Sequence, residues 1–195
     1  MRTKLTTILS ATILASATYC GCSADRSTKP EAASATVSKN QELLNNSASL
    51  LASLLKDEKN LNKILLIKSH SKELGGLIDA ISRAAADGEK QLEVLAQDDP
   101  GLNLNALELP SGEQAARKAI AKTKEYDLLF SSGDNFAFNL LVTQIDALSY
   151  GSHLAEIVAE NAPRGEPARQ FHSLATTFDR LLQQVTAQMR SLPQK

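Results

Sequence analysis

Apolar residues recur every three or four positions along most of the chain, with short polar breaks between the runs. This spacing is typical of amphipathic helices that bury one face. The longest run spans residues 131–162, where Gly133 can take a left-handed conformation and Asp134 can cap the helix that follows. A stripe of this length and width needs several helices around it, so the pattern predicts a helical bundle. The stripe contains Phe136, Phe138, Leu141, Ile145, Leu148, Leu154, Ile157 and Val158, and a parallel row contains Leu140, Ala147 and Tyr150.

The same periodicity predicts four further helices, over residues 41–66, over 72–97, from Ser111 onward, and over 167–192. The first contains a polar interruption at residues 56–60, which predicts a kink or a break. Ser71 and Ser111 are the expected N-caps of the next two helices. The third helix is the shortest, and its expected buried side consists of Ala116, Ala119, Ile120, Leu128 and Leu129.

These elements predict an all-α fold, an up-and-down four-helix bundle with one additional short helix. Short connections make sequential helices antiparallel. Composition agrees with this class, because aromatic residues make up only 4% of the chain, Trp is absent, and Leu and Ala supply most of the apolar side chains. Val and Ile do not gather in alternating runs, which excludes an all-β fold. The formal net charge is −1 and there is no basic tract, so no nucleic-acid partner is expected.

The N-terminal residues predict export. Arg2 and Lys4 precede a short apolar run over residues 5–17, which is too short to span a membrane, and Gly21-Cys22 follows. Gly21-Cys22 resembles the end of a bacterial lipoprotein box, although Tyr19 stands where an aliphatic residue is usual. We therefore expect a signal peptide over residues 1–21, a lipid on Cys22 and a flexible tether over 22–39. The alternative is ordinary cleavage, for instance after Ala17 or after Ala24.

The cysteines support the same interpretation of the N-terminus. Cys20 and Cys22 are the only two, so the expected domain over residues 40–195 must hold together without disulfides. Ser23 would follow a lipidated Cys22, and by resemblance to lipoprotein sorting this favours the outer membrane, with the domain facing the periplasm. The membrane would then be a partner through the lipid. A soluble periplasmic or secreted protein is the alternative.

The order of these features resembles a ferritin-like domain-of-unknown-function family of exported bacterial proteins. The matching features are Leu109-Pro110 before an acidic, Ala-rich short helix, the restart from Gly133 to Phe136, and the final helix that begins at Pro167. The resemblance covers roughly residues 43–190. It implies a ferritin-like four-helix bundle and little about activity, since the family has no single assigned function.

Ferritin-like bundles can hold two metals through carboxylates and Glu-x-x-His pairs, and the chain contains no Glu-x-x-His. Where inward ligands would be needed, the longest helix has Leu141, Gln144, Ile145 and Leu148. We therefore expect no metal and no other cofactor. The alternative metal ligands are His70, Glu73, His153, Glu156 and His172. Gln144 and Tyr150 could instead form a buried polar contact that fixes the register of this helix.

No catalytic constellation is recognisable. The domain has no P-loop, no Gly-rich dinucleotide turn and no Cys-x-x-Cys pair, so we do not expect an enzyme. The sequence predicts a non-enzymatic interaction or structural module of the cell envelope, working with a protein partner that the sequence does not identify. The alternative is a metal-binding ferritin-like protein with a role in oxidative stress or metal handling.

Overall fold

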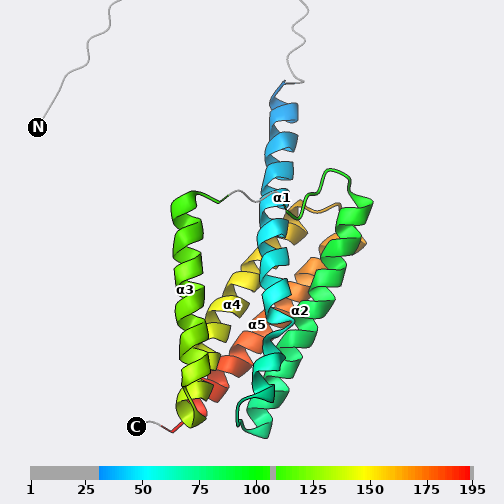
Figure 1. Ribbon diagram of the computed structural model, residues 1–195. Coiled ribbons are helices and arrows are strands. Elements are labelled where there is room, and N and C mark those ends of the chain that lie inside the picture. The colour runs from blue at the N-terminus through cyan, green and yellow to red at the C-terminus, as the bar shows by residue number, and fades with distance from the viewer. Residues whose placement is uncertain (1–30, 106–108, 194–195) are drawn as a thin grey trace, which may run out of the picture.

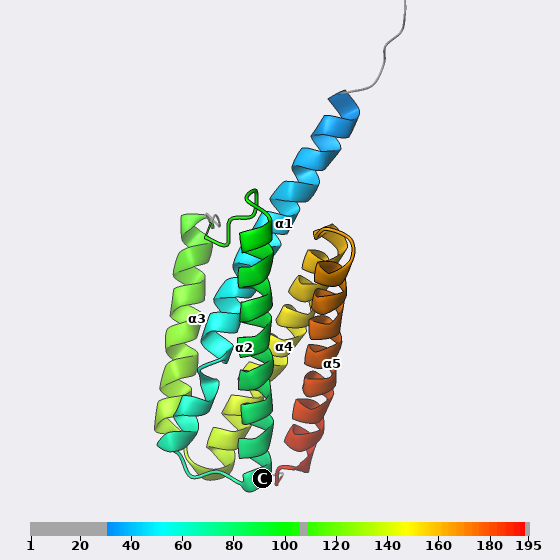
Figure 2. The ribbon, with the colours of Figure 1, turned by 90° about the vertical axis from the view of Figure 1, so that its right-hand side faces the viewer.

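The computed structural model describes residues 31–105 and 109–193, and of residues 31–38 the backbone alone. Within these ranges the chain is helical and has no strand, which confirms the predicted all-α class (Figures 1 and 2). Its elements in chain order are α1 (Glu31–Glu58), the 3₁₀ helix η1 (Leu61–Leu66), α2 (Lys72–Asp98), α3 (Ser111–Phe130), α4 (Gly133–Asn161) and α5 (Glu166–Ser191).

Four helices form the core of the described structure. α1 packs on α2 and α4, and α5 packs on the same two helices, so that each core helix has two neighbours. The five α-helices alternate in direction along the chain (Figure 1). In the chain, α3 follows α2 and precedes α4, and it runs the length of the molecule, so α2 and α4 point the same way. These two helices lie diagonally across the core, because each packs on α1 and α5.

The core is filled by aliphatic side chains and a few aromatic rings. Its largest fully buried side chains are Leu44, Leu51, Leu55, Leu74, Ile78, Ile81, Leu92, Phe136, Leu140, Leu141, Phe171 and Leu181. They come from α1, α2, α4 and α5, at the helical spacing read from the sequence. Burial of these side chains is the main favourable contribution to the stability of the fold.

Several predicted boundaries agree with the structure. α2 and α5 span almost the predicted residues, and the hydroxyl of Ser71 accepts a hydrogen bond from the amide of Leu74 at 3.1 Å, as expected of an N-cap. The polar interruption is a true break, since α1 ends at Glu58 and η1 begins at Leu61. α1 begins at Glu31 rather than Gln41, inside the expected tether, where Ala32, Ala33 and Ala35 favour a helix despite the lack of bulky apolar residues.

Two predicted caps are wrong, although Gly133 does take the expected left-handed conformation, with φ 56°. Pro110 occupies the N-cap position of α3, and Ser111 is the first helical residue. Ser132 occupies the N-cap position of α4, and Asp134 lies in the first turn. There the Asp134 carboxylate can still interact favourably with the positive end of the helix dipole.

The predicted buried side of α3 is also wrong. No residue of α3 is buried: Ile120 is 55% exposed and Leu129 is 42% exposed, and Leu128 alone among the large side chains is partly covered by the core. The physical reason is that α1, α2, α4 and α5 already cover one another. α3 has few large apolar residues at helical spacing, so it competes poorly for a place in the core.

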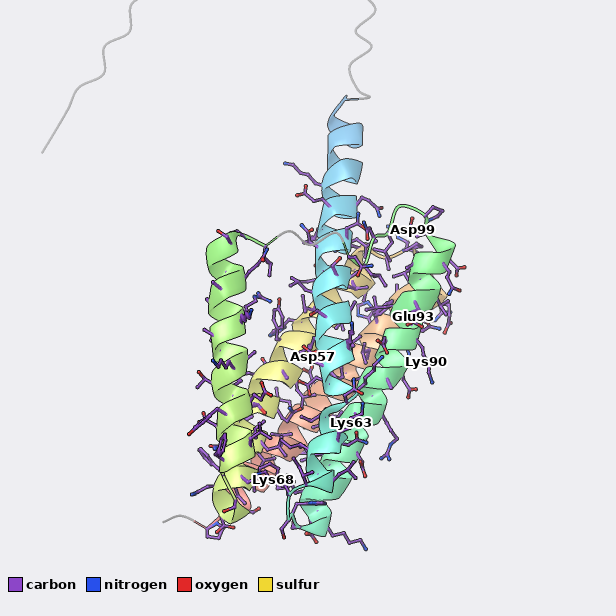
Figure 3. The ribbon with its side chains drawn as sticks, in the orientation of Figure 1. Asp57, Lys63, Lys68, Lys90, Glu93 and Asp99 are labelled. Carbon is purple, nitrogen blue, oxygen red and sulfur yellow. The ribbon has the colours of Figure 1, made fainter. Side chains whose placement is uncertain are left out.

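Polar contacts hold α3 against its neighbours instead. The ammonium of Lys124 pairs with Asp146 of α4 at 3.0 Å, and the guanidinium of Arg117 lies 6.0 Å from the centre of the Tyr150 ring. Near the C-terminal end of α3, Lys68 donates hydrogen bonds to the carbonyls of Leu129 at 2.6 Å and Ser131 at 2.8 Å (Figure 3). Exposed contacts of this kind each contribute only about 0–1 kcal/mol.

α4 and α5 approach closely at Gly151. A β-carbon on Gly151 would lie 2.8 Å from the buried ring of Phe178 and 2.9 Å from Leu54, whereas one on Gly76 of α2 would meet nothing within 4 Å. We predict that Gly151→Ala lowers the free energy of unfolding by about 1–2 kcal/mol, because overpacking outweighs the gain in helix propensity. Gly76→Ala should raise it by up to about 1 kcal/mol. Urea denaturation of both variants checks this, and equal effects would contradict it.

The loose attachment of α3 predicts its dynamics. Because few apolar contacts hold α3, its amide hydrogens should exchange with solvent faster than those of α4 in native-state hydrogen exchange. Lys68→Met removes the two hydrogen bonds to the end of α3 and should speed exchange there further, while α2 serves as the internal control. Equal protection of α3 and α4 would mean that α3 belongs to the same cooperative unit as the core.

Candidate functional site

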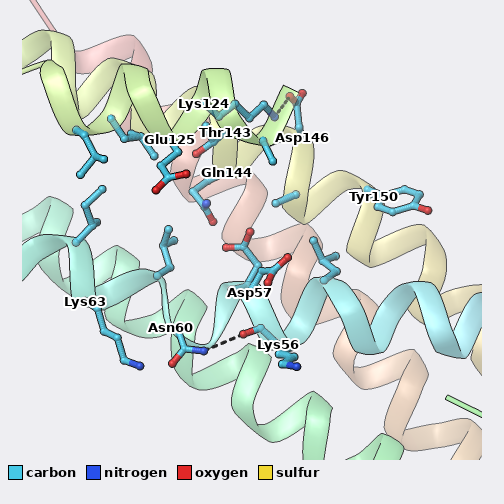
Figure 4. Close-up of a pocket in the computed structure, with 18 of the residues that line it drawn as sticks. Lys56, Asp57, Asn60, Lys63, Lys124, Glu125, Thr143, Gln144, Asp146 and Tyr150 are labelled. Carbon is cyan, nitrogen blue, oxygen red and sulfur yellow. Dashed lines mark hydrogen bonds and ion pairs between the residues drawn. The ribbon is translucent and has the colours of Figure 1, made fainter. Parts of the chain in front are cut away.

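A large groove separates α3 from the bundle. It has a volume of about 1010 Å³ and lies between the C-terminal end of α1, η1, α3 and α4 (Figure 4). It exists because α3 packs mainly on α4 and leaves the facing side chains of α1 and η1 partly exposed. Its apolar lining consists of Leu54, Leu61, Ile64, Ile67, Ala121, Leu128, Leu129 and Ala147.

Two side-chain oxygens are buried at the wall of this groove, one on the buried residue Gln144 and one on the partly exposed residue Glu58. Gln144, in the middle of α4, is 2% exposed, and its Oε1 has no hydrogen-bond partner among the described residues. Oε2 of Glu58, the last residue of α1, is also buried without a partner. A buried oxygen without a donor is costly, and such groups in a native protein call for an explanation.

The break between α1 and η1 positions Glu58. Its backbone carbonyl accepts a hydrogen bond from the hydroxyl of Ser82 on α2 at 3.1 Å, which holds the end of α1 against α2. The next residue, Lys59, forms an ion pair with Glu89 of α2. These two contacts fix the backbone at Glu58 and Lys59, and the Glu58 side chain lines the groove.

Burial changes the acidity of Glu58. Loss of solvation raises the pKa of its carboxyl from the ordinary 4.5 to about 7, and the negative charge of Asp57 adds to the rise. Hydrogen bonding from the Gln144 side chain and the positive charge of Lys124 act in the opposite direction. Desolvation also raises the pKa of Asp57, against the effect of Lys56. Near neutral pH, Glu58 is therefore poised between its neutral and charged forms.

The charged groups around the groove differ in what they pair with. Both groove cations of α3 are paired: Lys124 with Asp146 of α4, and Arg117 with Glu113 of α3 itself. Among the described residues, no salt bridge is formed by the groove carboxylates Asp57, Glu58 and Glu125 or by the groove lysines Lys56 and Lys63. Gln144 and Glu125 project into the space toward the end of α1, whereas Lys63 extends away from it (Figure 4).

The alternative metal ligands do not come together. His172 Nδ1 and Glu156 Oε2 are 2.9 Å apart in a half-exposed pair between α5 and α4. His153 and Glu73 are exposed, and His70 Nδ1 lies 2.8 Å from the carbonyl oxygen of Lys68. No group of three or more His, Cys, Asp or Glu that could hold a metal occurs within the described residues.

The sequence pattern pointed to part of this site only. Gln144 stands out as a polar residue in an apolar stripe, and it is buried, but Tyr150 is 38% exposed, so the two do not form the buried polar contact considered from the sequence. Glu58 escaped notice because it belongs to the polar interruption at 56–60, where a charged residue looks solvated. The spacing of apolar residues does not show that the chain turns after Glu58 or that this turn buries one oxygen of its carboxyl group.

Comparison with known proteins adds no relative: no family model, no curated protein and no solved structure matches the chain. Cys22, the expected signal peptide over 1–21 and the start of the expected tether lie outside the described residues. Among the helices that are described, none has the length and apolar character needed to cross a membrane.

The buried carboxyl predicts how stability depends on pH. Between pH 4.5 and about 7 the folded protein keeps a proton on Glu58 that the unfolded chain releases, so the free energy of unfolding falls as pH rises through this window. From the size of the shift, the loss is roughly 3 kcal/mol.

Glu58→Gln should remove this pH dependence. The variant should be more stable than the parent protein at pH 8, and its free energy of unfolding should change less between pH 5 and pH 8. Urea denaturation at pH 5 and pH 8 measures the effect. Glu125→Gln, an exposed carboxylate of the same groove, is the matched control and should change the profile little. A parent protein that is equally stable at both pH values would contradict the prediction.

Proposed function

We propose that the protein is an exported, lipid-anchored, non-enzymatic binding module of the cell envelope, which holds a guest molecule in the groove between α1, η1, α3 and α4. The observation that carries this proposal is a groove of about 1010 Å³ with an apolar lining and two buried, unpartnered oxygens at its wall. Sites for small molecules commonly measure about 300–1,000 Å³ and combine an apolar lining with a few polar groups.

The attachment of α3 supports a binding role over a purely structural one. A helix that only stabilised the fold would bury an apolar face, but α3 buries no residue and contacts the bundle mainly through polar side chains. The groove beside α3 leaves apolar side chains of η1 and its C-cap partly or largely exposed, among them Leu61, Ile64 and Ile67, at a cost in free energy. A guest with an apolar body would recover that cost.

We further infer that the core has a ferritin-like arrangement. Ferritin-like bundles join two helical hairpins through one long crossover connection. Here α1 with α2 and α4 with α5 are the two hairpins, and α3, which connects them in the chain, runs the length of the bundle along its outside (Figure 2). The diagonal, parallel placement of α2 and α4 is what such a crossover requires. The resemblance noted from Leu109-Pro110, Gly133 and Pro167 agrees with this inference.

Anchoring through Cys22 would hold the module at the membrane surface. The proposal places the protein in the outer membrane, facing the periplasm, with residues between Cys22 and α1 as the connection. Metabolic labelling with a radioactive fatty acid tests it: the parent protein should be labelled and Cys22→Ser should not. Labelling that persists in the variant would contradict anchoring at this residue.

Filling the groove should abolish guest binding. Ala121 of α3 lines the groove, while Ala119 is exposed on the same helix and does not. We predict that Ala121→Trp weakens binding of the neutral apolar dye N-phenylnaphthylamine by about tenfold or more, a loss of roughly 1.4 kcal/mol. Ala119→Trp should bind the dye like the parent protein.

The measurement is a fluorescence titration of each purified protein, with the helical content of both variants checked by circular dichroism. If the dye does not bind the parent protein, or binds both tryptophan variants equally well, the groove is not a binding site for apolar molecules.

A further inference from the structure

The unpartnered groups in the groove have one chemical property in common: they accept hydrogen bonds. Oε2 of Glu58 and Oε1 of Gln144 are buried and lack donors among the described residues. Gln144 is 2% exposed, so bulk water has little access to its side chain. Above pH 7, where Glu58 is mostly charged and has no O–H of its own, a guest that satisfies both oxygens must bring N–H or O–H donors to this wall of the groove.

The charges decide which donor fits. Asp57, Glu58 and Glu125 line the groove and form no salt bridge within the described part of the chain. The lining also contains four cations. Lys124 pairs with Asp146 at 3.0 Å and Arg117 with Glu113 at 2.6 Å. Lys56 and Lys63 form no salt bridge within the described residues, but both are exposed, and Lys63 extends away from the groove (Figure 4). A positively charged donor would complete this arrangement, whereas a carboxylate would be repelled by the carboxylates already there.

The apolar lining of the groove indicates the chemical character of the remainder of the guest. Leu61 and Ile64 of η1 face the groove opposite Leu128 of α3, and Ala121 and Ala147 leave room between the helices. These side chains offer no hydrogen bonds, so the part of the guest that contacts them must be hydrocarbon. The apolar and polar portions of the groove together fit an amphipathic molecule.

We propose that the guest is an organic cation, a protonated amine on an apolar body, whose ammonium group binds at Glu58 and Gln144 and whose body lies along η1 and α3. This inference rests on the proposed function and specifies the chemical class of its guest. An ammonium group supplies three donors, enough for both unpartnered oxygens and one further acceptor. Pairing with the carboxylate of Glu58 makes the hydrogen bond charge-assisted, which strengthens it.

Three probes with the same alkyl chain and different head groups test the proposal: octylamine, octanol and octanoate. Each is titrated against the full-length protein at pH 8 by displacement of N-phenylnaphthylamine. We expect octylamine to bind about tenfold or more tightly than octanol, because a charge-assisted hydrogen bond to a buried carboxylate is lost in the alcohol. Octanoate should bind more weakly than octanol.

Two variants locate the head group. Glu58→Gln should reduce the preference for octylamine over octanol to within about threefold, and Gln144→Met, which removes the amide oxygen at similar volume, should reduce it in part. Glu42→Gln changes an exposed carboxylate of α1 outside the groove and should leave the preference unchanged.

The outcomes separate the two proposals. If all three probes bind equally and Ala121→Trp blocks each of them, the groove binds apolar molecules and the inference of a cationic guest is wrong. The same conclusion follows if the preference for octylamine survives both Glu58→Gln and Gln144→Met. If none of the probes and no dye bind the parent protein, the proposed function itself fails.

Discussion

The packing of α4 between α1 and α5 is the contact on which the rest of the structure depends. α4 meets α5 along most of its length and meets α1 on its adjacent side, with Phe136, Leu140 and Leu148 among the side chains that these contacts cover. Gly151 allows the closest approach, since the ring of Phe178 occupies the space that a side chain there would need. Once these surfaces are joined, α2 closes the core from the opposite side.

This closure leaves α3 without a buried surface of its own. The apolar faces of α1, α2, α4 and α5 already cover one another, so α3 can bury little further apolar surface wherever it lies. It is held by one ion pair and one cation–π contact to α4, and by the hydrogen bonds that Lys68, between η1 and α2, donates to carbonyls at its C-terminal end. The groove therefore follows from the packing of the core. It is the space between the four-helix core and α3, which links α2 to α4 along the length of the bundle.

The sequence predicted where most helices lie in the chain, but it did not predict which helices pack against one another. The periodicity around Leu74, Ile78 and Ile81 predicted α2 closely, because burial in the core imposes that spacing and Ser71 marks its start. The same reasoning failed for α3, where Ile120 and Leu129 were expected on the buried side but are 55% and 42% exposed. Periodicity shows that a helix has an apolar side and does not show whether another element covers it.

The candidate site was harder to predict for a related reason. Gln144 could be recognised as a polar residue in an apolar stripe, but the burial of Glu58 depends on where the chain turns after α1 and on which helices then cover it. Those are long-range properties, which a charged residue in a polar segment does not reveal. The histidines illustrate the opposite case: His172 pairs with Glu156, but within the described residues no third His, Cys, Asp or Glu joins them in a group that could hold a metal.

The exposure of α3 has a consequence for how such a protein can change over evolutionary time. Substitutions at exposed positions usually alter stability by less than about 0.5 kcal/mol, and every residue of α3 is at least partly exposed. One wall of the groove can therefore accumulate mutations almost without effect on folding, while the other wall, built from α1 and α4, stays constrained by the core. Under the proposed mode of binding, changes in α3 would alter the fit of a guest's apolar body, whereas Glu58 and Gln144, which would bind its head group, lie on the constrained helices α1 and α4.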